Sequence, residues 1–247
     1  MTRRMGGTLA GITALLLLSG PASPLAAQGE RRQEAAAPAP PAPRLASGTP
    51  DLSGVWMGGG GVSTRNLKPG DTIELLPDAK ALMDSRQLGD DPELHCLPTG
   101  VPRMAPYPWR MVQTIDEKYV FILFEGNIHS YRQIFTDGRE HPSDPDPTWY
   151  GHSIGRWEGD TLVVDTVGYN DKFWFGSAGW PHTTQLHTIE RFTRTDLNTL
   201  QWDITIIDPG AYAKPFTVQT RARLERDWEL MEYICNENNT NIGHFTQ

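Results

Sequence analysis

The sequence predicts an all-β domain, an antiparallel meander closed into a lipocalin-like barrel of about nine or ten strands. Two observations support this prediction. Apolar and polar residues alternate with a period of two along most of the chain, in short segments rich in β-branched and aromatic side chains. Turn signals containing Gly, Asp or Asn separate these segments at short intervals. Evenly spaced strands joined by tight turns pair with their neighbours, and closing the barrel removes the exposed edges.

The individual elements follow from the same pattern. One short helix is expected near residues 77–88, because Pro77 and Asp78 suit the first turn of a helix. Two of the expected strands, 200–207 and 216–224, alternate cleanly and are typical of plain barrel wall. In chain order the expected strands are 54–56, 119–125, 129–135, 151–158, 161–168, 185–194, 200–207, 216–224 and 229–235.

The amino terminus has the order of a secretory signal peptide. Arg3 and Arg4 precede an apolar run from Leu9 to Leu18, and a small-residue stretch follows with a cleavage site expected near Ala27. The run is too short for a membrane span, so no stable membrane insertion is expected. We therefore expect a periplasmic or secreted protein with a signal peptide at 1–27.

Behind the signal peptide, residues 28–47 are rich in Ala and Pro and contain almost no large apolar side chains. Such a segment buries too little surface to offset the entropy of ordering it, so a disordered tether is expected. Residues 48–247 are long enough for a single β-barrel domain with a full core.

The net charge of the chain is −8, and removing Arg3 and Arg4 with the signal peptide leaves 20 basic and 30 acidic residues, a net charge of −10. An acidic surface repels phosphate backbones, which argues against nucleic acid as a partner. A small-molecule ligand or substrate is the expected partner.

Cys96 and Cys235 are the only cysteines, and both follow the predicted signal peptide. An even number of cysteines in an oxidising compartment predicts a disulfide between them. A thiol nucleophile or a zinc-thiolate site is then not expected.

Several motifs resemble known proteins. "DLSGVW" at 51–56 is similar to the Gly-x-Trp opening of lipocalin-like barrels. The stretches "YRQIFTDGR", "SIGRWEGDTLVVDT" and "EYICNEN" resemble a family of exported soil-bacterial proteins, over nearly the whole domain from Gly54 to Asn239. This resemblance implies a barrel and an exported location, and it assigns no reaction.

The segment "PHTTQLHTIERF" at 181–192 carries His182, His187 and Glu190. On a strand, Glu190 shares a face with Leu186 and Phe192, whereas His187 points to the opposite side. Zinc requires at least three convergent protein ligands, so this segment alone is not expected to bind a metal. No cofactor is predicted, and a divalent metal bound by residues from several strands stays an open alternative.

Glu190 is the leading candidate for an inward-facing catalytic group. A carboxyl group among apolar side chains is the setting in which a general acid or base is tuned. The structural alternative is a buried salt bridge from Glu190 to Arg132 or Arg191. His129 and Tyr131 share a face of the neighbouring expected strand 129–135, and that polar face is expected to line a cavity.

The loop 169–184 is unusually aromatic for a connection between strands. We expect it to be a lid over the barrel mouth that stacks on a ligand, and the alternative is a plug packed into the core. The expected ligand-binding residues are Tyr131, Trp149, Tyr169, Phe173, Trp174 and Trp180.

The sequence contains no nucleophile elbow, phosphate-binding loop or dinucleotide fingerprint. We therefore expect an exported enzyme that performs acid–base chemistry, such as isomerisation, elimination, cyclisation or hydrolysis, on a small ring-containing or apolar molecule held in the barrel. A lipocalin-like binding protein without turnover and an envelope adaptor are the alternatives. The candidate catalytic residues are Glu190, His187, His182, His129 and Arg132.

Overall fold

A computed structural model of the chain describes residues 39–103, 107–126, 128, 130–235 and 237. The predicted signal peptide, most of the predicted tether and the candidate His129 lie outside the described residues. The part described forms one compact unit that begins at Ala39.

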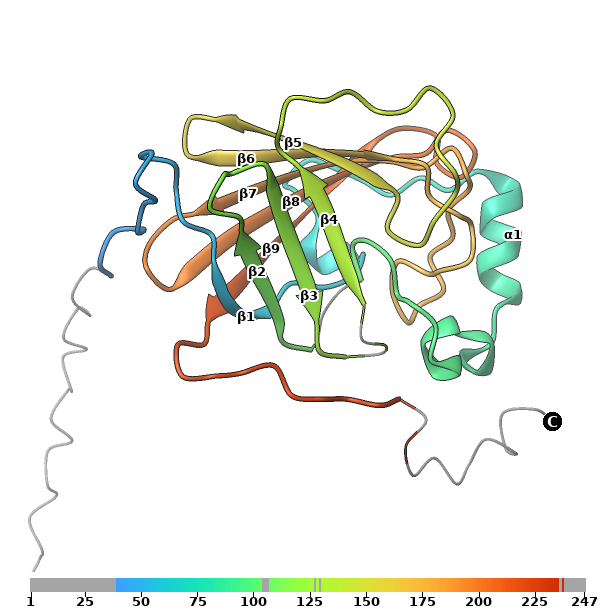
Figure 1. The fold of residues 1–247 in the computed structure, drawn as a ribbon. Coiled ribbons are helices and arrows are strands. Elements are labelled where there is room, and N and C mark those ends of the chain that lie inside the picture. Colours follow the sequence, from blue (N-terminus) through green and yellow to red (C-terminus); the bar gives the residue numbers. More distant parts are fainter. Residues whose placement is uncertain (1–38, 104–106, 127, 129, 236, 238–247) are drawn as a thin grey trace, which may run out of the picture. The chain divides into compact units, whose positions relative to one another are not determined.

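The domain is a closed barrel of nine strands, which confirms the predicted fold class (Figure 1). Each strand pairs with the next, and β1 pairs with β9 to close the barrel. The strands are β1 Gly54–Gly58, β2 Trp109–Gln113, β3 Tyr119–Phe124, β4 Tyr131–Phe135, β5 His152–Glu158, β6 Thr161–Val167, β7 His187–Arg194, β8 Thr199–Ile207 and β9 Phe216–Leu224.

One pairing corrects the expected meander: β4 and β5 run parallel. Only two residue pairs join them, Ile134 with Ser153 and Phe135 with Ile154. Parallel neighbours need a long connection that returns the chain to the same end, and residues 136–151 provide it. The barrel wall is therefore weakly joined at this position, and the returning loop lies beside it.

Two expectations about strands were wrong. Strand β2 was not predicted, because the prolines at 106 and 108 obscured the short alternating run after them. The expected strand 229–235 is irregular instead. Because β1 and β9 already pair with each other, the closed barrel has no free edge to accept a further strand.

Aromatic side chains fill the barrel interior. Trp109 packs against Trp56 and Trp202, with ring centroids 6.4 Å and 6.0 Å apart, and Phe192 stacks on Trp202 at 5.3 Å. All four side chains are completely buried. Burial of this much aromatic surface is the main source of stability in such a core.

Outside the barrel, helix α1 spans Pro77–Ser85, as the sequence predicted, and lies to one side of the strands (Figure 1). Residues 39–47, which the sequence analysis placed in the tether, contact the domain: Leu197 donates a backbone hydrogen bond to Pro40, and Arg44 pairs with Asp160. Among the described residues, no helix combines the length and apolar character needed to cross a membrane.

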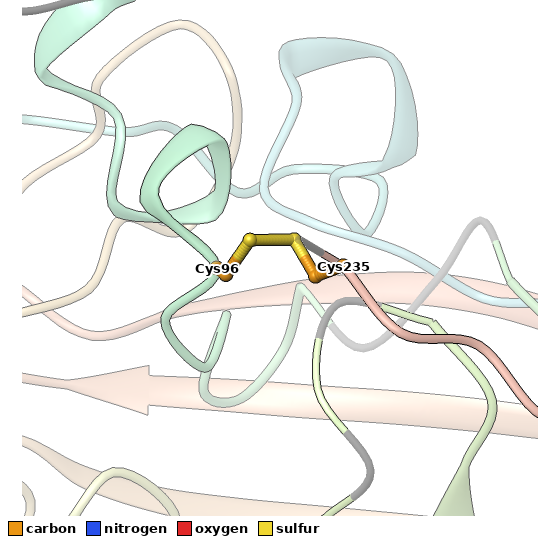
Figure 2. Close-up of a disulfide and its surroundings, with 2 residues drawn as sticks. All are labelled: Cys96 and Cys235. Carbon is orange, nitrogen blue, oxygen red and sulfur yellow. A yellow bond between two sulfur atoms is a disulfide. The ribbon is translucent and has the colours of Figure 1, made fainter. Parts of the chain in front are cut away.

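The predicted disulfide is present. Cys96, which follows a short 3₁₀ turn, is joined to Cys235 near the end of the described chain (Figure 2). The bond attaches the irregular segment after β9 to the body of the domain.

Candidate functional site

The residues predicted to be catalytic lie in three different environments. Glu190 and Arg132 are inside the barrel, His182 lies among aromatic rings near one end of it, and His187 points outward. The barrel therefore does not bring them together as one site.

Glu190 faces inward, as the alternation predicted, and forms a buried ion pair with Arg132. Nη1 and Nη2 of Arg132 donate to the Glu190 carboxylate, and Trp202 Nε1 donates to its Oε1 at 3.1 Å. Arg132 also donates to Ser153 and Thr166. Burial lowers the pKa of Arg132, but the Glu190 carboxylate more than offsets this, so Arg132 stays charged.

This geometry favours the structural alternative for Glu190. Its two oxygens are already engaged by Arg132 and Trp202, and both charged side chains are at most 1% exposed. The hydrogen bonds of Arg132 also link β4, β5, β6 and β7 across the short parallel pairing of β4 with β5. Its role in this structure is to hold the wall together.

The aromatic loop is packed as a plug, which corrects the expected lid. Tyr169, Phe173 and Trp174 are buried, with exposures of 0%, 0% and 5%. Phe173 contacts the rings of Tyr169 and Trp149 at 5.9 Å and 6.5 Å. The apolar area of these rings is more stable in the core than over an aqueous barrel mouth. Trp180, another of the expected ligand-binding residues in this loop, lines a cavity of about 540 Å³.

His182 belongs to the same plug. Its ring lies 4.0 Å from the centroid of Phe173 and 4.9 Å from that of Phe175. Burial lowers the pKa of His182 to about 4, although hydrogen bonding to the Thr183 carbonyl acts in the opposite direction. His182 is therefore a neutral packing residue near pH 7.

His187 takes part in a polar cluster on the outer face, the histidine chain, which consists of His141, His152, His187 and Asp165. Asp165 Oδ1 accepts a hydrogen bond from His187 at 2.8 Å and from Nε2 of His141 at 3.1 Å. Nδ1 of His141 lies 2.8 Å from Nδ1 of His152. The histidine chain thus runs from β7 through β6 and the 136–151 loop to β5.

Strand register explains why these residues meet. His152 pairs with Val167 of β6, and Asp165 lies two residues before Val167 on the same face. On the other side of β6, Asp165 pairs with Ile189, and His187 lies two residues before Ile189 on the same face of β7. The backbone of Gly151, with φ +64°, admits no side chain, because a Cβ would lie 2.6 Å from the Val167 carbonyl oxygen. Gly151 therefore lets the returning loop turn closely into β5 at His152.

The histidine chain ends at a cleft of about 400 Å³ where β4 and β5 diverge. We call it the seam cleft. His152 forms one side, and the candidate Tyr131, with 60% exposure, lies on the β4 side. Arg132 and Ser153 form part of its lining from the barrel interior. The remaining lining residues are Gln133, Phe135, Pro142, Pro145, Asp146, Thr148, Tyr150 and Gly151.

Two further features define the chemistry of the seam cleft. His152 stacks on Phe135, and the ring centroids lie 5.1 Å apart. Burial lowers the pKa of His152, and the neighbouring His141 and Arg139 lower it further. Burial raises the pKa of Tyr150 to about 12, so its hydroxyl, 2.7 Å from Ser130 Oγ, stays protonated. The lining of the cleft therefore includes a neutral imidazole and a phenolic O–H.

The sequence analysis did not identify His141, His152 and Asp165 as candidate site residues. The alternation of 161–168 carried a signal, because it places Asp165 on the outer face of β6 with Val163 and Val167. His141 had no such signal, since its place depends on the path of the returning loop.

Among the described residues, no group of three or more His, Cys, Asp or Glu side chains has an arrangement that could hold a metal ion. In comparisons with protein-family models, curated proteins and solved structures, no match to this chain was found.

Proposed function

We propose that the protein is an exported enzyme that performs acid–base chemistry on a small ring-containing molecule, with the reaction in the seam cleft and not in the barrel interior. The observation that carries this proposal is the hydrogen-bonded sequence Asp165–His141–His152, which ends beside the cleft. A carboxylate that orients a histidine is a recurring arrangement in general-base catalysis.

The hydrogen bonds determine which nitrogen carries each proton. Asp165 Oδ1 is an acceptor, so Nε2 of His141 carries a hydrogen and Nδ1 of His141 carries the lone pair. Nδ1–H of His152 then donates to that lone pair. The lone pair of His152 is thereby placed on Nε2. The opposite assignment would set the His141 lone pair against the Asp165 oxygen, which is repulsive.

In this arrangement His152 is the general base, and His141 and Asp165 are positioning residues. The lowered pKa of His152 keeps its imidazole neutral near pH 7, which is the form that abstracts a proton. Tyr150 supplies an O–H that can donate to oxygen or nitrogen on the substrate. Proton abstraction of this kind serves isomerisation, elimination, cyclisation or hydrolysis.

The walls of the seam cleft indicate the class of substrate. Tyr131, Phe135 and Tyr150 present aromatic surface, while Gln133 and Asp146 add polar groups. Clefts of this volume, with apolar walls and a few polar groups, are typical of small-molecule sites. The barrel centre is occupied by Trp56, Trp109 and Trp202, so it offers less support for a ligand held there.

Export to the periplasm or the cell exterior, after cleavage near Ala27, is part of the same proposal. The Cys96–Cys235 disulfide supports it, because such bonds persist in oxidising compartments.

The test is the elimination of 5-nitrobenzisoxazole, a reaction that needs only a positioned base beside an aromatic surface. We expect the wild-type protein to exceed free imidazole at equal concentration, and His152→Gln to lower the rate by about 100-fold. The acid limb of the pH–rate profile should have its midpoint below pH 6.5, because the base form of His152 persists below that pH.

His95→Gln is the matched control, since His95 lies on a short turn outside the seam cleft. It should leave the rate unchanged. Equal elimination rates for wild type and His152→Gln would show that His152 is not the base. Saturable binding of the probe with no elimination above imidazole would support the alternative, a binding protein without turnover.

A further inference from the structure

A second cavity, of about 540 Å³, lies between the segment after β1 and the plug loop, and it shares no lining residue with the seam cleft. We call it the Arg65 cavity. It is lined by Gly61, Val62, Ser63, Thr64, Arg65, Glu93, Arg103, Gly176, Ser177, Ala178 and Trp180. We propose that it is a binding site for a small carboxylate that carries an aromatic ring.

The walls of the Arg65 cavity are held in place by hydrogen bonds. Val62 N–H donates to the Phe175 carbonyl at 2.7 Å, and Phe175 N–H donates to the Trp180 carbonyl at 3.1 Å. Gly61 allows this close approach, because a Cβ there would lie 2.0 Å from the Phe175 oxygen. A cavity whose walls are already ordered loses little entropy when a ligand binds.

Arg65 supplies the positive charge. Apart from Arg65 and Arg110, every arginine in the described part of the chain donates a side-chain hydrogen bond or forms a salt bridge within the domain. Arg65 is exposed and lines this cavity. In a chain of net charge −8, an unpaired guanidinium in a preformed cavity is the group that an anion would contact.

Arg103 adds N–H donors of fixed orientation, but its positive charge is already balanced by carboxylates. Its guanidinium pairs with Asp91 at 2.8 Å and also with Glu93, and its side chain is only 11% exposed. These carboxylates neutralise Arg103 and would repel a multiply charged anion. The electrostatics therefore favour a ligand with a single negative charge, which Arg65 can balance.

The remaining groups select a planar carboxylate. A guanidinium binds a carboxylate through two parallel N–H donors, and the hydroxyls of Thr64 and Ser177 add further donors. Trp180 is half-buried, so part of its indole ring remains available to stack on an aromatic ring. The charge of Arg65, the hydroxyl donors and the indole ring of Trp180 together match an aromatic monocarboxylate.

The experiment is calorimetric titration of the disulfide-bonded protein with benzoate, benzamide and inorganic phosphate. We expect benzoate to bind saturably. Benzamide, which lacks the charge, and phosphate, which lacks the ring, should each bind at least 10-fold more weakly than benzoate. Arg65→Gln should weaken benzoate at least 10-fold, and Arg65→Lys should restore part of the affinity.

Arg110→Gln is the matched control, because it removes the other unpaired arginine, which lies outside the Arg65 cavity. It should change benzoate affinity less than twofold. Thermal unfolding of each variant checks that the fold is retained, and Arg65 is exposed, so no loss of stability is expected. The proposal is overturned if benzoate does not bind saturably, if benzamide or phosphate binds as tightly, or if Arg65→Gln and Arg110→Gln behave alike.

Discussion

At the scale of single residues, the structure separates two kinds of ionisable group that the sequence could not distinguish. Glu190 and Arg132 are buried and neutralise each other. His141, His152 and Asp165 are part-buried on the outer face, beside the seam cleft. A buried, fully bonded pair is a structural group, while a part-exposed imidazole with a lowered pKa can exchange protons with a ligand.

This distinction predicts how the Arg132–Glu190 pair responds to mutation. Glu190→Gln leaves the Arg132 charge buried without its partner, so the free energy of unfolding should fall by about 3 to 5 kcal/mol. The double variant Arg132→Met with Glu190→Leu removes both charges and should be more stable than Glu190→Gln. Urea denaturation monitored by tryptophan fluorescence measures both. A Glu190→Gln protein as stable as wild type would contradict the structural role.

At the scale of elements, the plug loop and the returning loop 136–151 decide where the two cavities lie. The plug places Tyr169, Phe173 and Phe175 in the core. The returning loop brings His141 to Asp165 and separates the ends of β4 and β5. The positions of both cavities thus follow from loops, while the strands provide a rigid frame.

The plug should make stability depend on pH through His182. Its pKa is 6.5 in the unfolded chain and about 4 in the folded protein, so between these values only the unfolded state binds the proton. The stability that His182 contributes is therefore complete above pH 6.5 and is lost as the pH falls towards 4, by about 3 kcal/mol.

Urea denaturation at pH 7, 5.5 and 4 measures this effect. The wild-type protein should lose more stability over this range than His182→Gln, whatever the absolute stability of the variant. His95→Gln, an exposed control, should keep the wild-type slope. Parallel slopes for wild type and His182→Gln would mean that His182 is not held neutral by the plug.

At the scale of the whole domain, closure of the barrel and the disulfide act on different parts of the chain. Pairing of β1 with β9 joins the two ends of the barrel. The Cys96–Cys235 bond holds the irregular segment after β9, which also donates from the Met231 backbone to Glu125. Together they restrain the chain from residue 54 to residue 235.

Removing the disulfide should therefore cost substantial stability. The cysteines are 139 residues apart, and the chain-entropy model gives about 5 kcal/mol for a loop of that length. Adding reductant should lower the unfolding midpoint of the wild-type protein, measured by circular dichroism. The variant with Ser at both positions serves as the control, because reductant should leave its midpoint unchanged. An unaffected wild-type midpoint would show that the bond restrains only the terminal segment.

The sequence by itself determined the barrel class, the helix that begins at Pro77, the disulfide partners and the inward face of Glu190. These follow from local rules: alternation with a period of two assigns each side chain of a strand to a face, and two cysteines allow one pairing. The sequence left Arg132 and Arg191 open as partners of Glu190, and the structure selects Arg132, which lies inside the barrel, whereas Arg191 is exposed and pairs with Glu158.

Only the tertiary structure decided that β4 and β5 are parallel, that the aromatic loop is a plug, and that His141, His152 and Asp165 meet. Each of these depends on contacts between segments far apart in the chain. Whether Phe173 covers a cavity or fills the core is set by the space between strands, and the contact of His141 with Asp165 is set by the path of the returning loop. Local periodicity carries no information about either, because it describes which face a residue occupies and not what lies opposite that face.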